Sequence, residues 1–259
     1  MASNQAPDIT LYRGFPWPGK YTWSPFVTKL EARLRFAGIS YRTDAGSPLG
    51  SPRGKIPYVD ITDRTTGAKT TISDSALITR GFIEDGVITD LNRDLDAEKK
   101  VFDAGVRALL EDRLYFYLNH EKWIENYYEM RKHALSALPY PVKVAVGYYI
   151  YRRQREMLYN QGTLRFTLKE LKGFKEDVWT SISELLVSRK AQKQGDGPFW
   201  VLGGEEPTEA DAVLFGFLAA SLVCSACPET RAILRGLPVV VEYARRIHDR
   251  YFPDYACWE

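Results

Sequence analysis

Cysteine and net charge are both scarce in this chain of 259 residues. Its 3 cysteines cannot form a disulfide framework, so we expect a reducing compartment and a cytoplasmic location. The 35 basic residues nearly balance the 33 acidic residues, which leaves a formal net charge of +2. A chain without an excess of Lys and Arg has little with which to neutralise phosphates, and no nucleic-acid partner is therefore expected.

Long hydrophobic runs are missing as well. Residues 1–8 are polar and contain no apolar core of a signal peptide. The longest uncharged apolar-rich run, Ala212–Cys227, has about 16 residues, fewer than the ~20 that span a bilayer. Because this run is rich in Ala, Gly and Ser, we assign it to a buried core helix and expect no transmembrane segment.

Metal-ligating side chains are few and scattered. The histidines, His120, His133 and His248, lie far apart along the chain. Cys224 and Cys227 have the spacing of a redox or zinc motif, but no histidine lies near them in the sequence. We therefore predict no metal site, and we interpret the two cysteines as buried structural thiols late in the apolar helix.

Hydrophobic periodicity changes near residue 90. The chain before this point predicts short elements in the order β-α-β-β-β-α, separated by loops rich in Gly and Pro. Helices are predicted after Ser24-Pro25 and after the capping residues 73–75. The strands are predicted at residues 9–15, 39–43, 56–61 and 69–72, the last two forming a hairpin about a turn at residues 65–67.

Apolar residues recur at helical spacing through almost all of the remaining chain. A very long amphipathic helix is broken by Pro139 and Pro141, and Thr208 with Asp211 forms the capping box of the apolar core helix. Further helices are predicted at residues 142–158, 168–191 and 239–251. We expect an α/β domain at residues 1–90 and an all-α domain, a helical bundle, at residues 95–259.

Ser24 is the first candidate for chemistry. A serine before Pro25 is a common start of a helix, where its oxygen caps the backbone and proline takes the first helical position. At this position the serine hydroxyl and the free N–H groups of the first turn also point beyond the helix N-terminus. The helix dipole favours a bound anion there. Both interpretations stay open, and they are compatible.

Three short sequences, in this order and spacing, resemble a known family. They are Ser24-Pro25-Phe26, Gly54-Lys55-Ile56-Pro57-Tyr58-Val59 and Ser73-Asp74-Ser75-Ala76-Leu77-Ile78. Together they resemble the N-terminal thioredoxin-like domain of glutathione transferases, and residues 199–212 look like the start of the buried helix in their helical domain. Residues 24–31 and 243–254 are most similar to the failed-axon-connections, cadmium-responsive and metaxin-like branch. The resemblance leaves out about residues 140–170.

The resemblance implies a glutathione transferase-like fold with a glutathione site in the N-terminal domain. It implies that Ser24 holds the glutathione thiol as a thiolate, and that Pro57 is cis, which leaves the backbone of Ile56 free to pair with the peptide. Asp74 and Ser75 would hold the γ-glutamyl group, and Lys55 would reach a carboxylate. The alternatives are an edge-strand proline, a capping pair and a solvated lysine.

Four aromatic residues, Phe15, Trp17, Tyr21 and Trp23, lie in the loop before Ser24. They are candidates for the wall of an apolar electrophile site, although loop aromatics also fill ordinary cores. Tyr12 is a second candidate for the thiol donor, because several glutathione transferases use a tyrosine near the end of the first strand. Its place in the middle of the predicted strand favours Ser24.

The implied activity is a glutathione transferase or a glutathione-dependent isomerase, with glutathione as cosubstrate. The thiolate would attack an apolar electrophile, by conjugation or by addition and elimination that isomerises a double bond. Detoxification or secondary metabolism would be the setting, and the resemblance implies a homodimer. The alternative is a non-catalytic, metaxin-like interaction module.

Overall fold

The computed structural model describes residues 7–64 and 66–258, so residues 1–6 and Thr65 of the predicted turn lie outside the described residues. Its N-terminal part is a four-stranded sheet with the order β2-β1-β3-β4. β1 pairs in parallel with β2 and antiparallel with β3, and β3 forms an antiparallel hairpin with β4. The strands are β1 (Asp8–Tyr12), β2 (Arg42–Asp44), β3 (Tyr58–Thr62) and β4 (Lys69–Ser73).

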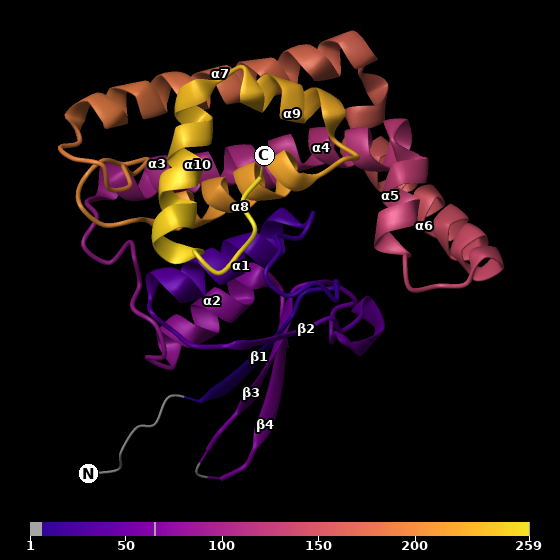
Figure 1. Ribbon diagram of the computed structural model, residues 1–259, viewed down its shortest axis with the longest axis horizontal. Coiled ribbons are helices and arrows are strands. Elements are labelled where there is room, and N and C mark those ends of the chain that lie inside the picture. The colour runs from indigo at the N-terminus through magenta and orange to yellow at the C-terminus, as the bar shows by residue number, and fades with distance from the viewer. Residues whose placement is uncertain (1–6, 65, 259) are drawn as a thin grey trace.

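Two helices cover the sheet on the side that faces the rest of the molecule (Figure 1). They are α1 (Pro25–Phe36) and α2 (Ser75–Glu84), and a short 3-10 turn, η1 (Pro48–Gly50), lies in the loop after β2. The apolar core between the sheet and these helices includes Leu11 and Val59 from the strands, with Leu30, Ile78 and Phe82 from the helices. The order β-α-β-β-β-α predicted from periodicity is confirmed, and with it the thioredoxin-like sheet.

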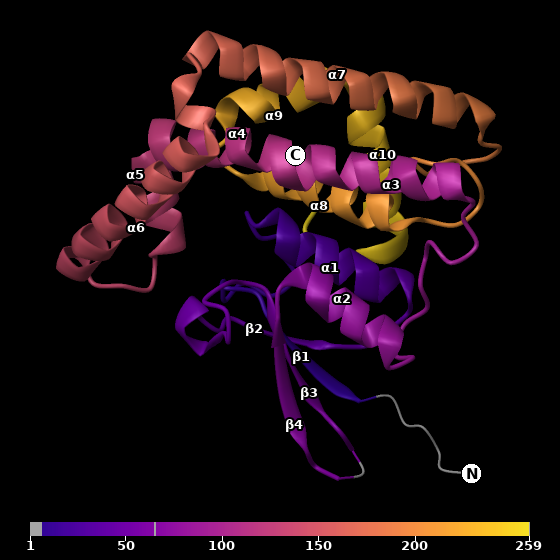
Figure 2. The same cartoon turned by 180° about the vertical axis from the view of Figure 1, so that it is seen from behind.

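The remaining chain is helical and stacks above α1 (Figure 2). A long helix consists of α3 (Ala97–Ala108), α4 (Tyr115–His120) and two π-helical segments, η2 (Leu109–Leu114) and η3 (Glu121–Glu125). The later elements are α5 (Tyr127–Ala134), α6 (Tyr140–Gln161), η4 (Thr163–Arg165), α7 (Leu168–Gln192), α8 (Glu209–Val223), α9 (Pro228–Arg235) and α10 (Pro238–Tyr251). The fold therefore has a thioredoxin-like sheet region followed by a helical bundle, as predicted.

Helix α8 is the centre of the helical region, and nearly all of its side chains are buried. Its start is fixed by the predicted capping box, since the Asp211 carboxylate accepts hydrogen bonds from the backbone N–H and the hydroxyl of Thr208, at 2.8 and 2.9 Å. Gly216 lets α8 approach the start of α1. A Cβ atom at this position would lie 2.6 Å from the carbonyl oxygen of Pro25 and 2.8 Å from the backbone nitrogen of Lys29. The packing of α8 thus sets the place of the α1 N-terminus.

Several boundaries differ from the sequence-based expectation. The first strand ends at Tyr12 rather than residue 15, because the Arg13 side chain turns inward and donates to the carbonyls of Trp17 and Lys20. The apolar helix ends at Val223, so the prediction that Cys224 and Cys227 lie within it is wrong. They lie in the turn before α9, a helix that periodicity did not predict.

Within residues 7–64 and 66–258 no single helix is long and apolar enough to cross a membrane. Only α8 and α9 taken together reach the required length and composition, and they are bent by 113° at their junction.

Candidate active site

The N-terminus of α1 presents Ser24 as the N-cap residue, with Pro25 at the first helical position. Ser24 has extended backbone angles, and its hydroxyl forms no capping hydrogen bond. Thr22 and Ser24 are instead joined by a local turn, in which the Ser24 N–H donates to the Thr22 hydroxyl at 3.3 Å. The Ser24 hydroxyl therefore has no partner among the described residues and remains available to a ligand.

Ser24 lines a cavity of about 170 Å³ between the α1 end of the sheet region and the helical region. Phe15, Trp23 and Ile56 contribute to it from the N-terminal side. The long helix contributes the opposite wall. The remaining lining residues are Pro25, Phe26, Tyr115, Leu118, Asn119, Lys122, Trp123 and Met130. The cavity is largely apolar and aromatic, with a hydroxyl and a cation among its polar groups.

Of the predicted glutathione-binding residues, Ile56 lines this cavity, and the others are linked to it along the chain and by one hydrogen bond. The Ile56–Pro57 bond is cis, as expected, and Ile56 lines the cavity. The Asp74 N–H donates to the Pro57 carbonyl at 3.4 Å, which ties the start of α2 to the proline turn. Ser75 follows Asp74 directly, and Lys55 is exposed beside Ile56.

Asp74 has an unusual backbone conformation. Among the described residues, Asp74 is the only residue other than glycine with a positive φ, which is 82°. Its carboxylate accepts hydrogen bonds from the N–H groups of Ala76 and Leu77. A positive φ at such a residue costs roughly 1–3 kcal/mol and persists where the surroundings fix it. The capping interpretation of Asp74 is confirmed, and the capping hydrogen bonds use only one of its two carboxylate oxygens.

The aromatic loop packs around a histidine that the sequence did not connect with it. The ring of His133, from α5, stacks on Trp23 with 3.3 Å between centroids and an interplanar angle of 2°. Phe15 and Trp17 pack against the same imidazole. Burial lowers the pKa of His133 from 6.5 to about 4, so the ring is neutral at physiological pH. Phe15 and Trp23 line the cavity, whereas Trp17 supports them from behind.

Tyr21, predicted in the aromatic wall, and Tyr12, the second candidate for the thiol donor, are not among the described residues that line the cavity. Tyr21 is buried in the C-terminal core, where its hydroxyl lies 2.8 Å from Nδ1 of His248. Tyr12 donates its phenol proton to Asp60 at 2.8 Å and stacks on Tyr58. This hydrogen bond, together with burial, raises the pKa of Tyr12 to about 12, which makes it a poor thiol activator.

Lys122, in η3, is a site residue that the sequence did not reveal. Among the described residues that line the cavity, it is the one that carries a full charge. Its ammonium group is buried and donates to the carbonyl of Trp23 at 2.8 Å. Burial opposes this charge, but the neighbouring thiols of Cys227 and Cys224 and the phenol of Tyr115 raise the pKa of Lys122 above its usual value. The cavity therefore includes a lysine ammonium that is hydrogen-bonded to the residue before Ser24.

The two cysteines lie behind this cation, in an apolar cluster with Trp23, Trp123 and Met130. Both are fully buried, with free thiols. Burial opposes ionisation of both thiols, but a hydrogen bond from Cys227 and the ammonium of Lys122 lower the pKa of Cys224. The interpretation as buried thiols agrees with their burial. Across the described ranges no group of three or more His, Cys, Asp or Glu side chains could hold a metal ion.

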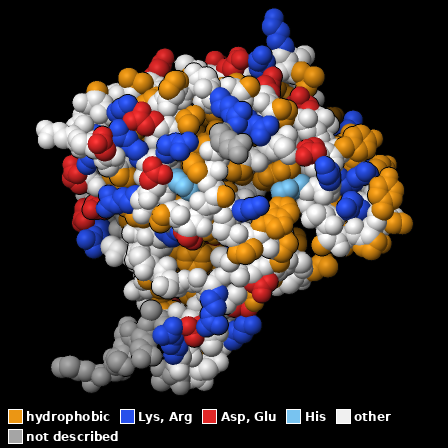
Figure 3. Space-filling model, viewed as in Figure 1, with side chains coloured by type: hydrophobic (Ala, Val, Ile, Leu, Met, Phe, Trp, Pro, Cys, Tyr) orange, Lys and Arg blue, Asp and Glu red, His pale blue; other side chains and the backbone are white. Residues whose placement is uncertain are grey.

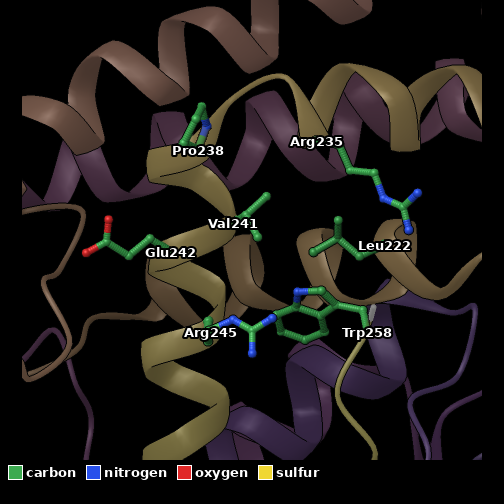
Figure 4. Close-up of a pocket in the computed structure, with 7 residues that line it drawn as sticks. All are labelled: Leu222, Arg235, Pro238, Val241, Glu242, Arg245 and Trp258. Atoms are coloured by element: carbon green, nitrogen blue, oxygen red, sulfur yellow. The ribbon is translucent and has the colours of Figure 1, made fainter.

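A second, larger hollow of about 570 Å³ lies between the end of α8, α9, α10 and the C-terminal segment. Figure 4 shows Arg235 and Arg245 on opposite sides of it, with the Trp258 indole below Val241. It shares no lining residue with the Ser24 cavity and includes none of the predicted site residues. The helix N-terminus, the Ser24 hydroxyl and the buried Lys122 are therefore all found at the smaller cavity, which we treat as the candidate active site.

Comparison with known proteins agrees with this geometry. Residues 25–130 match the family model of the glutathione S-transferase N-terminal domain. Glutathione transferase GSTFuA2 from Phanerochaete chrysosporium is 17% identical, with a TM-score of 0.58 over 94% of this chain and 98% of that chain. A maleylacetoacetate isomerase from Anaeromyxobacter dehalogenans, solved with glutathione in its active site, is 12% identical, with a TM-score of 0.51 over 97% and 96%. FzlA from C. crescentus is 14% identical, with a TM-score of 0.58 over 95% and 91%.

At such low identity the solved structures show a shared fold, and they do not single out the failed-axon-connections, cadmium-responsive and metaxin-like branch. The family model adds a match in sequence, which begins one residue after Ser24 and ends within α5. This chain is therefore similar to the glutathione S-transferase N-terminal domain over residues 25–130, and it shares the two-part fold of the solved glutathione transferases.

Proposed function

We propose that the protein binds glutathione at the N-terminus of α1 and activates its thiol for attack on an apolar electrophile. The observation that carries this proposal is the Ser24 hydroxyl, which has no hydrogen-bond partner among the described residues and lies at a cavity that the buried Lys122 also lines. A hydroxyl donor, a helix N-terminus and a cation all favour an anion at one point. A thiol with an ordinary pKa of ~8.5 would ionise more readily there.

The glutathione backbone fits the surface that continues from Ser24. Ile56 lies at the cavity beside the cis-proline turn, so its peptide groups can pair with an extended ligand as an added strand would. Asp74 and Ser75 at the start of α2 would receive the γ-glutamyl end. Lys55, exposed on the adjacent loop, would reach a carboxylate.

The electrophile would enter from the aromatic side, between Phe15, Trp23 and the long helix. At about 170 Å³ the enclosed space is below the ~300–1,000 Å³ of ligand pockets for drug-sized molecules. It therefore admits the reactive end of a substrate and leaves the remainder outside. Lys122 is placed to stabilise negative charge that develops on a carbonyl oxygen of that end.

Two outcomes are consistent with this site. In both, the thiolate sulfur forms a bond to one carbon of an activated double bond and the electron pair moves to the carbonyl oxygen. If the neighbouring carbon then takes a proton, the product is a stable conjugate. If the former double bond rotates and the thiolate leaves again, the product is an isomer and glutathione is regenerated.

Calorimetry with glutathione tests the binding step, and turnover of a model electrophile tests the role of Ser24. We expect the wild type to bind glutathione and Ser24→Ala to bind it with similar affinity. Loss of one donor to the developing anion should lower the rate of Ser24→Ala by roughly 10²–10³. Ser181→Ala, on the exposed face of α7, is the matched control and should react like the wild type.

The outcomes separate the two parts of the proposal. Absence of any heat of binding with glutathione would refute the enzyme assignment and leave the interaction module as the better description. Binding without a rate difference between the wild type and Ser24→Ala would retain glutathione but remove Ser24 from the chemistry.

A further inference from the structure

Helix α6 packs against the protein along one side only. Its inner stripe consists of residues spaced by three or four positions, with Gly147 and Leu158 buried and Lys143, Ile150 and Gln154 half-buried. Gly147 is in tight contact with α5, since a Cβ atom there would lie 2.6 Å from Cδ of Arg131. Figure 2 shows α5 and α6 projecting from the helical region.

A second stripe with the same spacing runs along the solvent-exposed part of α6, and we call it the outer stripe. Every one of its residues is exposed, and Tyr148 and Tyr159 are both 58% accessible. The stripe consists of Pro141, Val144, Tyr148, Arg152, Arg155 and Tyr159. Single exposed apolar residues are normal, but this stripe aligns two arginines with Pro141, Val144 and two tyrosines on one helix, which makes it a candidate interaction surface. In Figure 3 hydrophobic side chains gather at the edge of the molecule where Figure 1 places this helix.

The charges on this helix are predominantly positive. Lys143, Arg152, Arg153 and Arg155 are its cations, and Glu156 is its single carboxylate. Arg153 lies over the ring of Tyr149 at 5.9 Å, and Arg152 contacts the Tyr148 hydroxyl at 3.5 Å. In the part of the chain that the structure describes, neither these two arginines nor Arg155 forms an ion pair with a carboxylate. A partner that carries negative charge would therefore be complementary to this surface.

We propose that the outer stripe of α6 binds the surface of a bilayer that contains anionic phospholipid. The stripe is convex and runs along a helix of 22 residues, which suits a flat partner better than a strand of nucleic acid that needs a groove. Tyrosine and arginine both place an apolar stem in the acyl boundary and a polar tip at the headgroups. A symmetric contact with a second copy would bring the arginines of one stripe against those of the other, which is repulsive.

Sedimentation with phospholipid vesicles tests this proposal on the full chain. We expect the wild type to sediment with vesicles of phosphatidylcholine and phosphatidylserine but not with phosphatidylcholine alone, and to be released by added salt. Arg152→Glu with Arg155→Glu should weaken the binding roughly tenfold or more, because each basic residue near such a surface contributes about the energy of a fivefold change. Tyr148→Ser should weaken it less.

The matched control is Lys100→Glu with Lys169→Glu, which makes the same change of net charge at exposed positions on α3 and α7. This control should sediment like the wild type. Equal loss of binding in both double variants would overturn the proposal, since net charge alone would then be responsible. Failure of the wild type to bind the anionic vesicles would also overturn the proposal. So would tighter binding to a single-stranded RNA homopolymer, or a wild-type dimer in light scattering that the α6 variant abolishes.

Discussion

Replacement of Lys122 by methionine is the most direct test of how the cavity acts on a bound thiol. The Lys122 ammonium lies 2.8 Å from the Trp23 carbonyl oxygen, and Ser24 is the next residue. Ser24 and Lys122 line the same cavity, and we take ~7 Å as the separation between this cation and a thiolate held at Ser24. At an effective dielectric constant of about 20, two unit charges at that distance attract each other by roughly 2.4 kcal/mol.

That energy corresponds to about 1.7 units of thiol pKa, and water at the cavity mouth reduces it to about 1. We therefore expect the thiol of bound glutathione to ionise about 1 to 2 pH units higher in Lys122→Met than in the wild type. The assay is the ultraviolet absorbance of the thiolate as a function of pH. It is recorded as the difference between protein with and without glutathione, so that Cys224 and Cys227 cancel.

Two further measurements separate this electrostatic effect from damage to the fold. Lys122→Met removes the donor to the Trp23 carbonyl and should cost ~1–3 kcal/mol in urea unfolding, so glutathione binding must be confirmed by calorimetry first. Lys55→Met is the matched control, because this exposed lysine would affect affinity but not thiol ionisation. A folded Lys122→Met protein that binds glutathione with an unchanged thiol pKa would refute the role of the cation.

Two other substitutions probe the supports of the cavity. Gly216→Ala places a Cβ atom 2.6 Å from the carbonyl oxygen of Pro25, so α1 must move, and we expect urea unfolding to show a loss of ~1–3 kcal/mol together with slower turnover. Gly173→Ala, which meets nothing within 4 Å, should be neutral or stabilising, and equal behaviour of the two variants would contradict the reasoning. His133→Phe addresses pH. Because the pKa of His133 falls from 6.5 to about 4 on folding, the unfolded chain binds more protons between these values. The stability that neutral His133 provides is therefore complete above pH 6.5 and lost as the pH falls towards 4. The full difference corresponds to ~3.4 kcal/mol, which partial exposure of the ring reduces to ~1–2. The stability of the wild type relative to His133→Phe should fall by that amount over this range, and a constant difference would show that the imidazole does not titrate as described.

The parts of the site that follow local rules could be predicted from the sequence. Ser24 before Pro25 specifies a helix start, and Asp74 before the start of α2 supplies a carboxylate at the position where free N–H groups need one. The capping box of Thr208 and Asp211 is local in the same sense. These motifs each depend on residues no more than three positions apart, so spacing alone carries the information.

The parts that depend on distant contacts could not be predicted in this way. A lysine such as Lys122 normally indicates an exposed position, and its burial is stabilised by a carbonyl 99 residues away in sequence. The ring of Tyr21 lies in the same loop as Phe15 and Trp23, yet it turns into the core because His248, in α10, accepts or donates a hydrogen bond there. Loop membership therefore does not decide which aromatic residues face the cavity.

The peptide group between Trp23 and Ser24 takes part in both a local motif and a contact between residues distant in sequence. Its carbonyl binds the Lys122 ammonium of the helical region, while the serine that follows it begins α1 in the sheet region. The Trp23 carbonyl and the Ser24 N–H belong to one planar peptide unit, so Lys122 binds directly beside the residue that carries the hydroxyl. Because Lys122 comes from the helical region, the sheet region alone contains the hydroxyl but lacks the cation. The chemistry proposed for this cavity consequently requires both parts of the chain to be packed together.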